Sequence, residues 1–322
     1  MLQRKLGRSG LSVSAIGFGA WGIGGATPGA TSYSRTDDAT SLRALETAFE
    51  RGITFYDTSS AYGGGHSEEL IGRAFSDRRD KAVIATKAGM LPGFAGTDFS
   101  PAWLRRSLEQ SLLRLGTDRV DVLQLHNPPP EAVKGKPEIL ETLWRFQEEG
   151  KIRAFGISTK SPADALAMLD APGLACLQVN LNLLDWRAAD TGLLERAAAR
   201  GVGIIARTPL AFGFLSGAVD ATTRFAADDH RSKLGPEQAR RWARAADDIF
   251  AAIAEAGPPR PRALTALRFC LSFPAVATAI PGVLTPQEAA LNAEAAALPP
   301  FTEEEMRLAE LAYRRHEKTL GG

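Results

Sequence analysis

The stretch GITFYDTSSAYGG at residues 52–64 is the part of the sequence from which the fold is predicted. It begins with the short run Ile53–Tyr56, rich in residues that favour β-strands, and continues through Asp57 into small polar residues and glycines. The segment His66–Phe75 follows with a helical pattern. In proteins built from parallel strands, functional groups gather at the carboxyl ends of the strands. Asp57 and Tyr62 are therefore candidates for a functional site, although a turn that ends a strand and a packed loop tyrosine would give the same pattern.

The alternation of strand and helix repeats along most of the chain. The apolar runs are short and nearly continuous, as expected for strands buried on both faces, and no linker interrupts them. We therefore predict an α/β protein with one (β/α)8 TIM-barrel domain over residues 1–322, an N-terminal β-hairpin at Leu2–Val13 and extra C-terminal helices. The predicted barrel strands are Ser14–Phe18, Ile53–Tyr56, Ala82–Thr86, Val120–Leu125, Ala154–Ile157, Leu177–Leu181, Gly203–Ala206 and Ala275–Ile280. The predicted helices are Ser41–Arg51, Glu68–Phe75, Pro101–Leu115, Lys136–Glu149, Pro162–Leu169, Thr191–Arg200, Glu237–Ala256, Arg262–Ser272, Pro286–Ala296 and Phe301–Lys318.

Composition narrows the class of protein. A net charge of +1 gives no bias toward nucleic acid or an anionic membrane. The cysteines Cys176 and Cys270 lie in apolar runs, which indicates packed thiols in a reducing compartment, and no cluster of Cys and His predicts a metal site. The N-terminus lacks the pattern of a signal peptide. We expect a cytoplasmic monomer or weak homo-oligomer that binds no nucleic acid, membrane or metal.

Four polar side chains stand at or near the ends of three successive predicted strands. Asp57, Lys87 and His126 each follow a strand, and Tyr62 lies in the loop after the first one. A buried ammonium needs a partner, and Asp57 is the natural partner of Lys87. Each residue alone could be a surface lysine or a packed core histidine, but their joint occurrence favours a functional site.

The chemistry that these side chains support is proton transfer to a carbonyl oxygen. A free tyrosine has a pKa of about 10, too high for efficient acid–base work near neutrality. The ammonium of Lys87 would stabilise a tyrosinate at Tyr62, and Asp57 would keep Lys87 charged and in place. His126 could donate or accept a hydrogen bond at the same oxygen. None of the four supplies a reductant, so a cofactor must bring the hydride.

The chain resembles the aldo-keto reductase superfamily over essentially its full length. The motifs that carry the resemblance are GITFYDTSSAYGGGHSEELIGRA (52–74), VIATKAG (83–89), DVLQLHNP (121–128), IRAFGIST (152–159) and AIPGVLTPQEAALN (279–292). The resemblance implies a (β/α)8 barrel and NADPH-dependent reduction of an aldehyde or ketone. It implies that Tyr62 is the general acid, that Lys87 and Asp57 tune it, and that His126 orients the substrate.

The resemblance also implies a set of cofactor-binding residues. Ser158, Thr159 and Gln178 match positions at the nicotinamide carboxamide, although relatives usually carry Asn where this chain has Thr159. Arg207 replaces a tyrosine that often stacks on the nicotinamide. The other implied residues are Gly19, Ala20, Trp21 and Asp57 at strand ends, Thr208, Pro209, Leu210 and Gly213 along the pyrophosphate, and Gly282, Val283, Glu288 and Asn292 at the adenosine end.

The adenosine end departs from the family pattern. Leu284 stands where many relatives carry a basic residue for the 2′-phosphate, and Glu288 stands where Gln is common. Both changes weaken the case for NADPH over NADH, because a phosphate needs cationic donors. Arg224 or Arg231 could replace the missing cation. We expect NADP to be preferred, with NAD possible.

The substrate side is less defined. A small carbonyl or alcohol is expected to lie among Trp21, Tyr62, His126 and Asn127, and an aromatic wall at Trp21 would exclude water. The loops Gly22–Arg35 and Leu210–Gly235 follow predicted strands. Residues 228–231 within the second could form a lid contact or a solvated turn, and the turn is favoured unless the loop closes over the cofactor.

Two alternatives remain open. One is an NAD-dependent alcohol or sugar dehydrogenase that works in the oxidative direction with the same four residues. The other is a nicotinamide-binding regulatory subunit with little turnover, against which the intact set of four counts. A barrel hydrolase would require a metal or a pair of carboxylates, and the sequence assembles neither.

Overall fold

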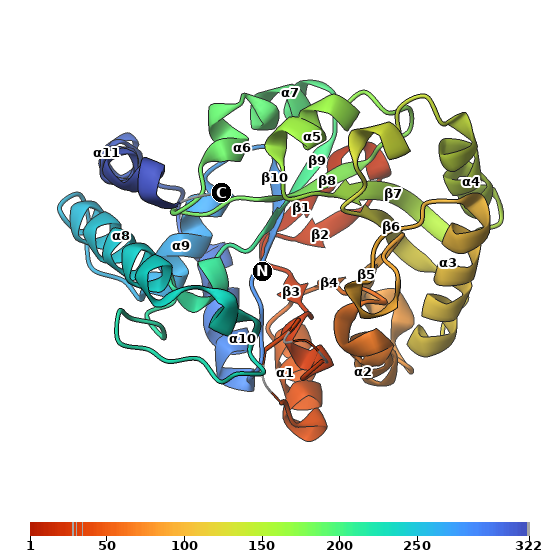
Figure 1. Cartoon of the computed structure of the whole chain (residues 1–322), viewed down its shortest axis with the longest axis horizontal. Coiled ribbons are helices and arrows are strands. Elements are labelled where there is room, and N and C mark those ends of the chain that lie inside the picture. The colour runs from red at the N-terminus through yellow and green to blue at the C-terminus, as the bar shows by residue number, and fades with distance from the viewer. Residues whose placement is uncertain (28, 30, 34, 321–322) are drawn as a thin grey trace.

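The structure, a computed structural model, describes residues 1–27, 29, 31–33 and 35–320. Eight parallel strands form a nearly closed barrel surrounded by helices, and a short antiparallel hairpin precedes it (Figure 1). Isolated bridges from Ile16 to Ala279 and from Gly19 to Gly282 bring the first barrel strand to the last. The predicted (β/α)8 barrel with an N-terminal hairpin is therefore confirmed. Residues 28, 30 and 34 of the predicted loop Gly22–Arg35 lie outside the described residues.

The strands lie in the barrel in the order in which they occur in the chain. The hairpin consists of β1 (Gln3–Lys5) and β2 (Ser12–Ser14), and the barrel consists of β3 (Phe18–Gly19), β4 (Phe55–Asp57), β5 (Val83–Ala88), β6 (Val120–His126), β7 (Ile152–Ser158), β8 (Cys176–Asn180), β9 (Gly203–Arg207) and β10 (Val276–Ile280). Asp57, Lys87 and His126 lie within β4, β5 and β6, not after them as predicted, because strand pairing continues past the apolar run. The first strand was predicted too early, since Ser14 pairs with Gln3 in the hairpin.

The helices match the predicted segments closely, because their start and stop signals are local. Ser100 caps α3 by accepting a hydrogen bond from Trp103 N, Pro101 occupies the first turn, and Gly116 ends the helix in the left-handed conformation. The helices are α1 (Asp38–Glu50), α2 (His66–Ala74), α3 (Pro101–Leu115), α4 (Pro137–Glu148), α5 (Pro162–Met168), α6 (Arg187–Asp190), α7 (Leu193–Ala199), α8 (Pro236–Ala254), α9 (Arg262–Leu271), α10 (Pro286–Glu294) and α11 (Glu303–Leu320). The unpredicted helix α6 is a single short turn.

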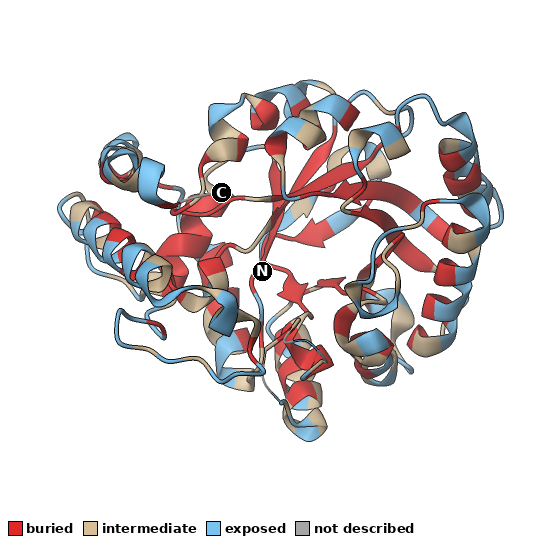
Figure 2. Ribbon diagram, viewed as in Figure 1, coloured by how far each residue is buried: buried red, intermediate tan, exposed pale blue. Residues whose placement is uncertain are grey.

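The core fills the barrel and the layer between strands and helices. Figure 2 shows buried residues along the strands and on the inner faces of the helices, with exposed residues on the outer helix faces. Hairpin residues Leu6, Leu11 and Val13 pack in one apolar cluster with Phe55 and Ile205. The hairpin thereby packs against the amino ends of the strands, since Gly7 also closely approaches the backbone of Gly203, the first residue of β9.

The sequence-based expectations about the cysteines, a metal site and a membrane span can be compared with the described part of the chain. Both cysteines are buried and unpaired, in keeping with the predicted packing role. No group of metal-binding side chains is assembled among the described residues. None of the described helices has the length and hydropathy that a membrane span would require.

A buried ion pair ties α11 to α9. Arg268 on α9 donates to both carboxylate oxygens of Glu305 on α11, each at 2.6 Å, and both side chains are only 3% exposed. The guanidinium also donates to the carbonyls of Pro299 and Pro300. The hydrogen bonds from Arg268 lower the pKa of Glu305 to about 2. The C-terminal helix is thus held by a pair in which each charge depends on the other.

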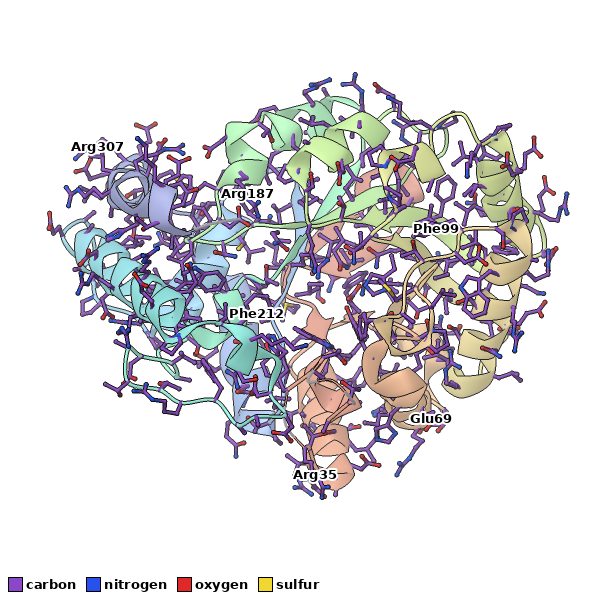
Figure 3. The ribbon with its side chains drawn as sticks, in the orientation of Figure 1. Arg35, Glu69, Phe99, Arg187, Phe212 and Arg307 are labelled. Atoms are coloured by element: carbon purple, nitrogen blue, oxygen red, sulfur yellow. The ribbon has the colours of Figure 1, made fainter. Side chains whose placement is uncertain are left out.

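Replacing Arg268 by Met should destabilise the protein by about 3 kcal/mol, because Glu305 would lose its hydrogen-bonded guanidinium and keep only Arg260 at 3.8 Å and the Thr302 backbone N as partners. Urea unfolding measures this loss. The difference from the wild type should shrink as the pH falls from about 4.5 toward 2, because the wild type then loses the stability that the lowered pKa of Glu305 provides. The matched control is Arg307→Met, because Arg307 pairs with Glu304 at the exposed outer edge of α11 (Figure 3). Equal effects of the two substitutions would contradict the assignment.

Candidate active site

The adjacent strands β4, β5 and β6 bring three charged or polar groups together at the carboxyl end of the barrel. Lys87 Nζ donates to Asp57 Oδ1 at 2.5 Å, to the Thr58 carbonyl at 2.8 Å and to Tyr62 OH at 3.2 Å. An ammonium has three protons to donate, so all of them are used. Lys87 is 1% exposed and Asp57 is 2% exposed, so both charges are out of solvent. The expected pairing of Lys87 with Asp57 and its contact with Tyr62 are both present.

Asp57 is held by two amides as well as by Lys87. Gln124 Nε2 donates to Asp57 Oδ2 at 2.9 Å, and Gln178 Nε2 donates to the same oxygen at 2.6 Å. Sequence reasoning missed Gln124, although a polar residue inside the apolar run 122–125 was a usable signal. Gln178 was assigned to the cofactor, but its amide nitrogen is engaged by Asp57 in this structure. Neutral donors of this kind help to offset the cost of burying the carboxylate.

Glycines position Tyr62. The turn Tyr62–Gly65 has φ angles of 62° at Gly63, 64° at Gly64 and 105° at Gly65, values that only glycine adopts readily. A Cβ atom on Gly63 would lie 2.1 Å from the carbonyl oxygen of Gly24, so the two loops approach as closely as the backbone allows. The turn places the tyrosine ring against Lys87, with its side chain at the wall of a cavity.

His126 is buried and held by a hydroxyl. Its Nδ1 lies 3.2 Å from Ser59 Oγ, and Ser59 Oγ already accepts a hydrogen bond from Ala61 N. If Ser59 donates its hydroxyl proton to Nδ1, the proton of the neutral ring is on Nε2. Burial, followed by the charges of Lys87, Arg207 and Lys160, holds the pKa of His126 well below its usual value. His126 is thus a neutral hydrogen-bond donor. Ser59 was missed because its partner comes from another strand.

A cavity of about 350 Å³ opens beside these groups. Most residues expected at a cofactor line it: Gly19, Ala20, Trp21, Asp57, Gln178, Arg207, Thr208, Pro209, Leu210, Gly213, Gly282, Val283, Glu288 and Asn292. Ser158 and Thr159 do not. Ser158 Oγ donates to Gln178 Oε1 at 3.1 Å and accepts from Arg207 Nη1 at 3.3 Å, whereas Thr159 Oγ1 accepts from Ser161 N. The carbonyl of Ser158 accepts from the backbone of Asn127, which has a φ of 53°.

Aromatic side chains from two loops meet at one wall of the cavity. The ring of His230 lies 4.5 Å from Trp21, 4.8 Å from Tyr33 and 5.1 Å from Phe212, measured between centroids. His230 N donates to the carbonyl of Ser32 at 2.8 Å, which joins the loop after β9 to the loop after β3. Phe212 lies toward the middle of the molecule in Figure 3.

Of the two alternatives for residues 228–231, the solvated turn does not match the structure, and contact with the cavity wall does, since His230 packs on Trp21 and Tyr33. Asp229 is 3% exposed and binds the guanidinium of Arg231 through both carboxylate oxygens. Burial lowers the pKa of His230 to about 4. The local sequence is polar and gave no sign of this packing, because the partners of His230 lie in a loop about two hundred residues away along the chain.

The far wall of the cavity contains a buried polar atom that a ligand could satisfy. Asn292 is 2% exposed, and its Nδ2 has no hydrogen-bond partner among the described residues. Glu288, unlike Asn292, has its hydrogen bonds within the protein. Its Oε2 accepts from the backbone N of Leu284 at 2.7 Å and of Thr285 at 3.1 Å, and it forms part of the capping box of α10. The free donor of Asn292, in the wall that the sequence assigns to adenosine, fits a bound nucleotide.

Comparison with known proteins gives consistent matches. The model of the aldo/keto reductase family matches residues 15–313. An uncharacterized oxidoreductase of Bacillus subtilis is 28% identical over 313 residues, covering 95% of each chain. L-galactose dehydrogenase of Arabidopsis thaliana is 35% identical over 221 residues, covering 66% of each. Among solved structures, a glycerol dehydrogenase of Gluconobacter oxydans has a TM-score of 0.81 at 27% identity, covering 99% of this chain and 97% of that chain.

The neutral state of His126 can be tested by NMR of the histidine rings while the pH is lowered from about 8 to about 5. His66 should titrate before His126, because its hydrogen bonds to Asp38 and Glu69 outweigh its partial burial and raise its pKa. His126 should remain unprotonated over this range, since burial favours the neutral ring. The spectrum of His126→Gln assigns the signal. Titration of His126 near its ordinary value of 6.5 would contradict the electrostatic account.

Proposed function

The chain belongs to the aldo/keto reductase family, and on that premise we propose that it transfers hydride between a nicotinamide dinucleotide and a carbonyl compound, reducing an aldehyde or ketone to an alcohol. The observation that carries this proposal is the position of the Lys87 ammonium, which contacts both the Asp57 carboxylate and the Tyr62 hydroxyl beside a cavity. The four side chains expected from the sequence supply a proton and hydrogen bonds. They supply no electrons.

The proposed chemistry begins with the carbonyl oxygen of the substrate near Tyr62 and His126. A bound reduced nicotinamide would supply the hydride to the carbonyl carbon. Tyr62 would donate its hydroxyl proton to the oxygen as negative charge develops there. Lys87, 3.2 Å from that hydroxyl, would stabilise the tyrosinate that remains. His126 would donate from Nε2 to the same oxygen, because Ser59 engages Nδ1.

The oxidative direction is the second candidate. Two similar proteins, L-galactose dehydrogenase and a glycerol dehydrogenase, are named for the oxidation of an alcohol. The same groups serve that direction, with the tyrosinate of Tyr62 accepting the hydroxyl proton. The presence of all four side chains in contact argues against a regulatory subunit with little turnover. The expected cytoplasmic location, single-domain organisation and weak or absent oligomerisation stay predictions.

Local charge supports NADH as the cofactor, in place of the NADPH preference expected from the sequence. Tyr33 lies in the cavity wall near Arg231, Asp229 and Glu288, and burial raises its pKa to about 12. Arg231 was a candidate for binding a 2′-phosphate, but Asp229 neutralises its charge through two hydrogen bonds. Glu288 has no cationic partner among the described residues, and Leu284 provides none. A 2′-phosphate placed at this wall would therefore meet net negative charge.

Replacing Tyr62 by Phe tests the proton donor. The rate constant for hydride transfer to an aldehyde should fall by roughly 10²- to 10⁴-fold, the range that general acids supply. The affinity for reduced dinucleotide should stay close to that of the wild type, because the ring is retained and the hydroxyl acts on the substrate. Stopped-flow absorbance of the reduced nicotinamide gives the rate, and fluorescence titration gives the affinity. Activity that survives in this variant would remove Tyr62 from its role.

The cofactor preference is tested by titrating the protein with NADH and NADPH and comparing the dissociation constants. The wild type should bind NADH more tightly. The double variant Leu284→Arg/Glu288→Gln should shift the ratio toward NADPH by about 10-fold or more, since it adds a guanidinium and removes a carboxylate. Arg224→Gln tests the other cation considered for the 2′-phosphate: Arg224 is not among the residues that line the cavity and donates to Thr222 and Thr223 on an exposed loop, so this change should leave the ratio unaltered. An unchanged ratio in the double variant would mean that the 2′-position lies elsewhere.

A further inference from the structure

Two cations without partners flank His126. Arg207 is the last residue of β9 and lines the cavity, and among the described residues its guanidinium donates to Ser158 Oγ at 3.3 Å. Lys160 lies two residues past the end of β7, and its side chain is partly accessible to solvent. Neither forms an ion pair with a carboxylate in the part of the chain that the structure describes. This differs from the arrangement at Lys87, whose three protons are all used by protein acceptors.

The strand pairing brings these cations to the same side of the barrel opening as His126. His126 pairs with Ser158 across β6 and β7, and Ser158 pairs with Gln178 across β7 and β8. Lys160 therefore comes from the loop next to His126, and Arg207 stands two strands farther around the barrel. Both cations lower the pKa of His126, after burial and Lys87, and Arg207 also lowers the pKa of Lys160, after burial. The two positive charges are close enough to oppose each other.

No carboxylate in this region compensates them. Among the last residue of each barrel strand and the two residues that follow it, Asp57 is the only acidic side chain, and it is engaged by Lys87, Gln124 and Gln178. With His126 neutral, the β7–β9 side of the opening carries two positive charges and no carboxylate among these positions, whereas Glu288 lies at the wall assigned to adenosine. Two like charges held near each other are unfavourable, and a bound anion would relieve the repulsion.

We propose that the substrate is a carbonyl compound with an anionic group, a carboxylate or phosphate a few bonds from the carbonyl, and that Lys160 together with Arg207 binds that group. The carbonyl oxygen then lies at Tyr62 and His126 while the anion lies toward β7 and β9. This inference rests on the proposed function, because it specifies the substrate of the same site. The product is the corresponding anionic alcohol, so the step upstream must generate an anionic aldehyde or ketone.

Lys160 is the residue that distinguishes substrate binding from cofactor binding. Arg207 lines the same cavity as Thr208 and Leu210, and the family resemblance puts it at the nicotinamide, so its charge could instead face a bound dinucleotide. Lys160 is not part of that cavity wall and comes from the strand next to His126. A change at Lys160 that weakens the binding of anionic substrates should therefore leave the affinity for dinucleotide close to that of the wild type.

The test compares matched substrates that differ in one charged group: glycolaldehyde phosphate with glycolaldehyde, and succinic semialdehyde with butanal. The wild type should reduce at least one anionic member with a kcat/KM about 10-fold or more above that of its neutral partner, chiefly through a lower KM. Preference within the first pair indicates phosphate, and preference within the second indicates carboxylate. Equal kcat/KM values in both pairs would overturn this inference and leave the proposed function standing. Absence of reduction in all four reactions would overturn both.

The matching variants are Lys160→Gln, Lys160→Arg and the control Lys81→Gln, in which the exposed lysine precedes β5 at the other end of the barrel. Lys160→Gln should lower the ratio of kcat/KM for the anionic and neutral members by about 10-fold, and Lys160→Arg should largely restore it. The control should change neither value. Added salt should raise the KM of the anionic member more in the wild type than in Lys160→Gln. An unchanged ratio in Lys160→Gln, or a loss of dinucleotide affinity equal to the loss for the anionic substrate, would overturn the role of Lys160.

Discussion

The ion pair between Lys87 and Asp57 is the interaction on which the arrangement of the site depends. Both charges lie at the end of adjacent strands and are almost completely removed from solvent. Moving two such ions out of water costs several kcal/mol each, and their mutual attraction offsets this only when the remaining hydrogen bonds are satisfied. The Thr58 carbonyl accepts a further hydrogen bond from Lys87, and the side-chain amides of Gln124 and Gln178 donate hydrogen bonds to Asp57. The barrel provides these partners because four of its strands direct polar groups toward one point.

This constraint explains why Tyr62 can lie where it does. Two of the three Lys87 protons are fixed by Asp57 and Thr58, which leaves one directed at the tyrosine hydroxyl. The glycine turn after Tyr62 then brings the ring against the ammonium. A lysine free to rotate would share its protons with water and would stabilise a tyrosinate less. The rigidity of the pair is therefore part of the chemistry, because it presents a preorganised positive charge to the oxygen that must change its charge.

The sequence was sufficient to predict the barrel, the hairpin and the meeting of Asp57, Lys87 and His126, because strand periodicity and helix caps are local signals and parallel strands share one functional end. It was insufficient for contacts that depend on tertiary placement. The Thr three residues before Glu288 is compatible with a capping box. This pattern alone did not decide whether Glu288 binds the cofactor or caps the helix. The packing of His230 on Trp21 likewise depends on two loops whose ends are placed by different strands.

The carboxyl end of the barrel contains one cation whose protons are all taken by protein acceptors and two cations without a carboxylate partner. This difference bears on which of them can bind a ligand. Lys87 is buried, and protein acceptors take all its protons, so no ligand is needed to stabilise it. Lys160 and Arg207 have no carboxylate partner in the described chain, although their repulsion is evident in the lowered pKa of Lys160, to which burial contributes most. A fold that supplies three amide or ammonium donors to one carboxylate could have supplied one carboxylate to these cations. Their charge is instead suited to an anionic substrate, which binds and dissociates in each catalytic cycle, whereas a carboxylate of the protein would stay in place.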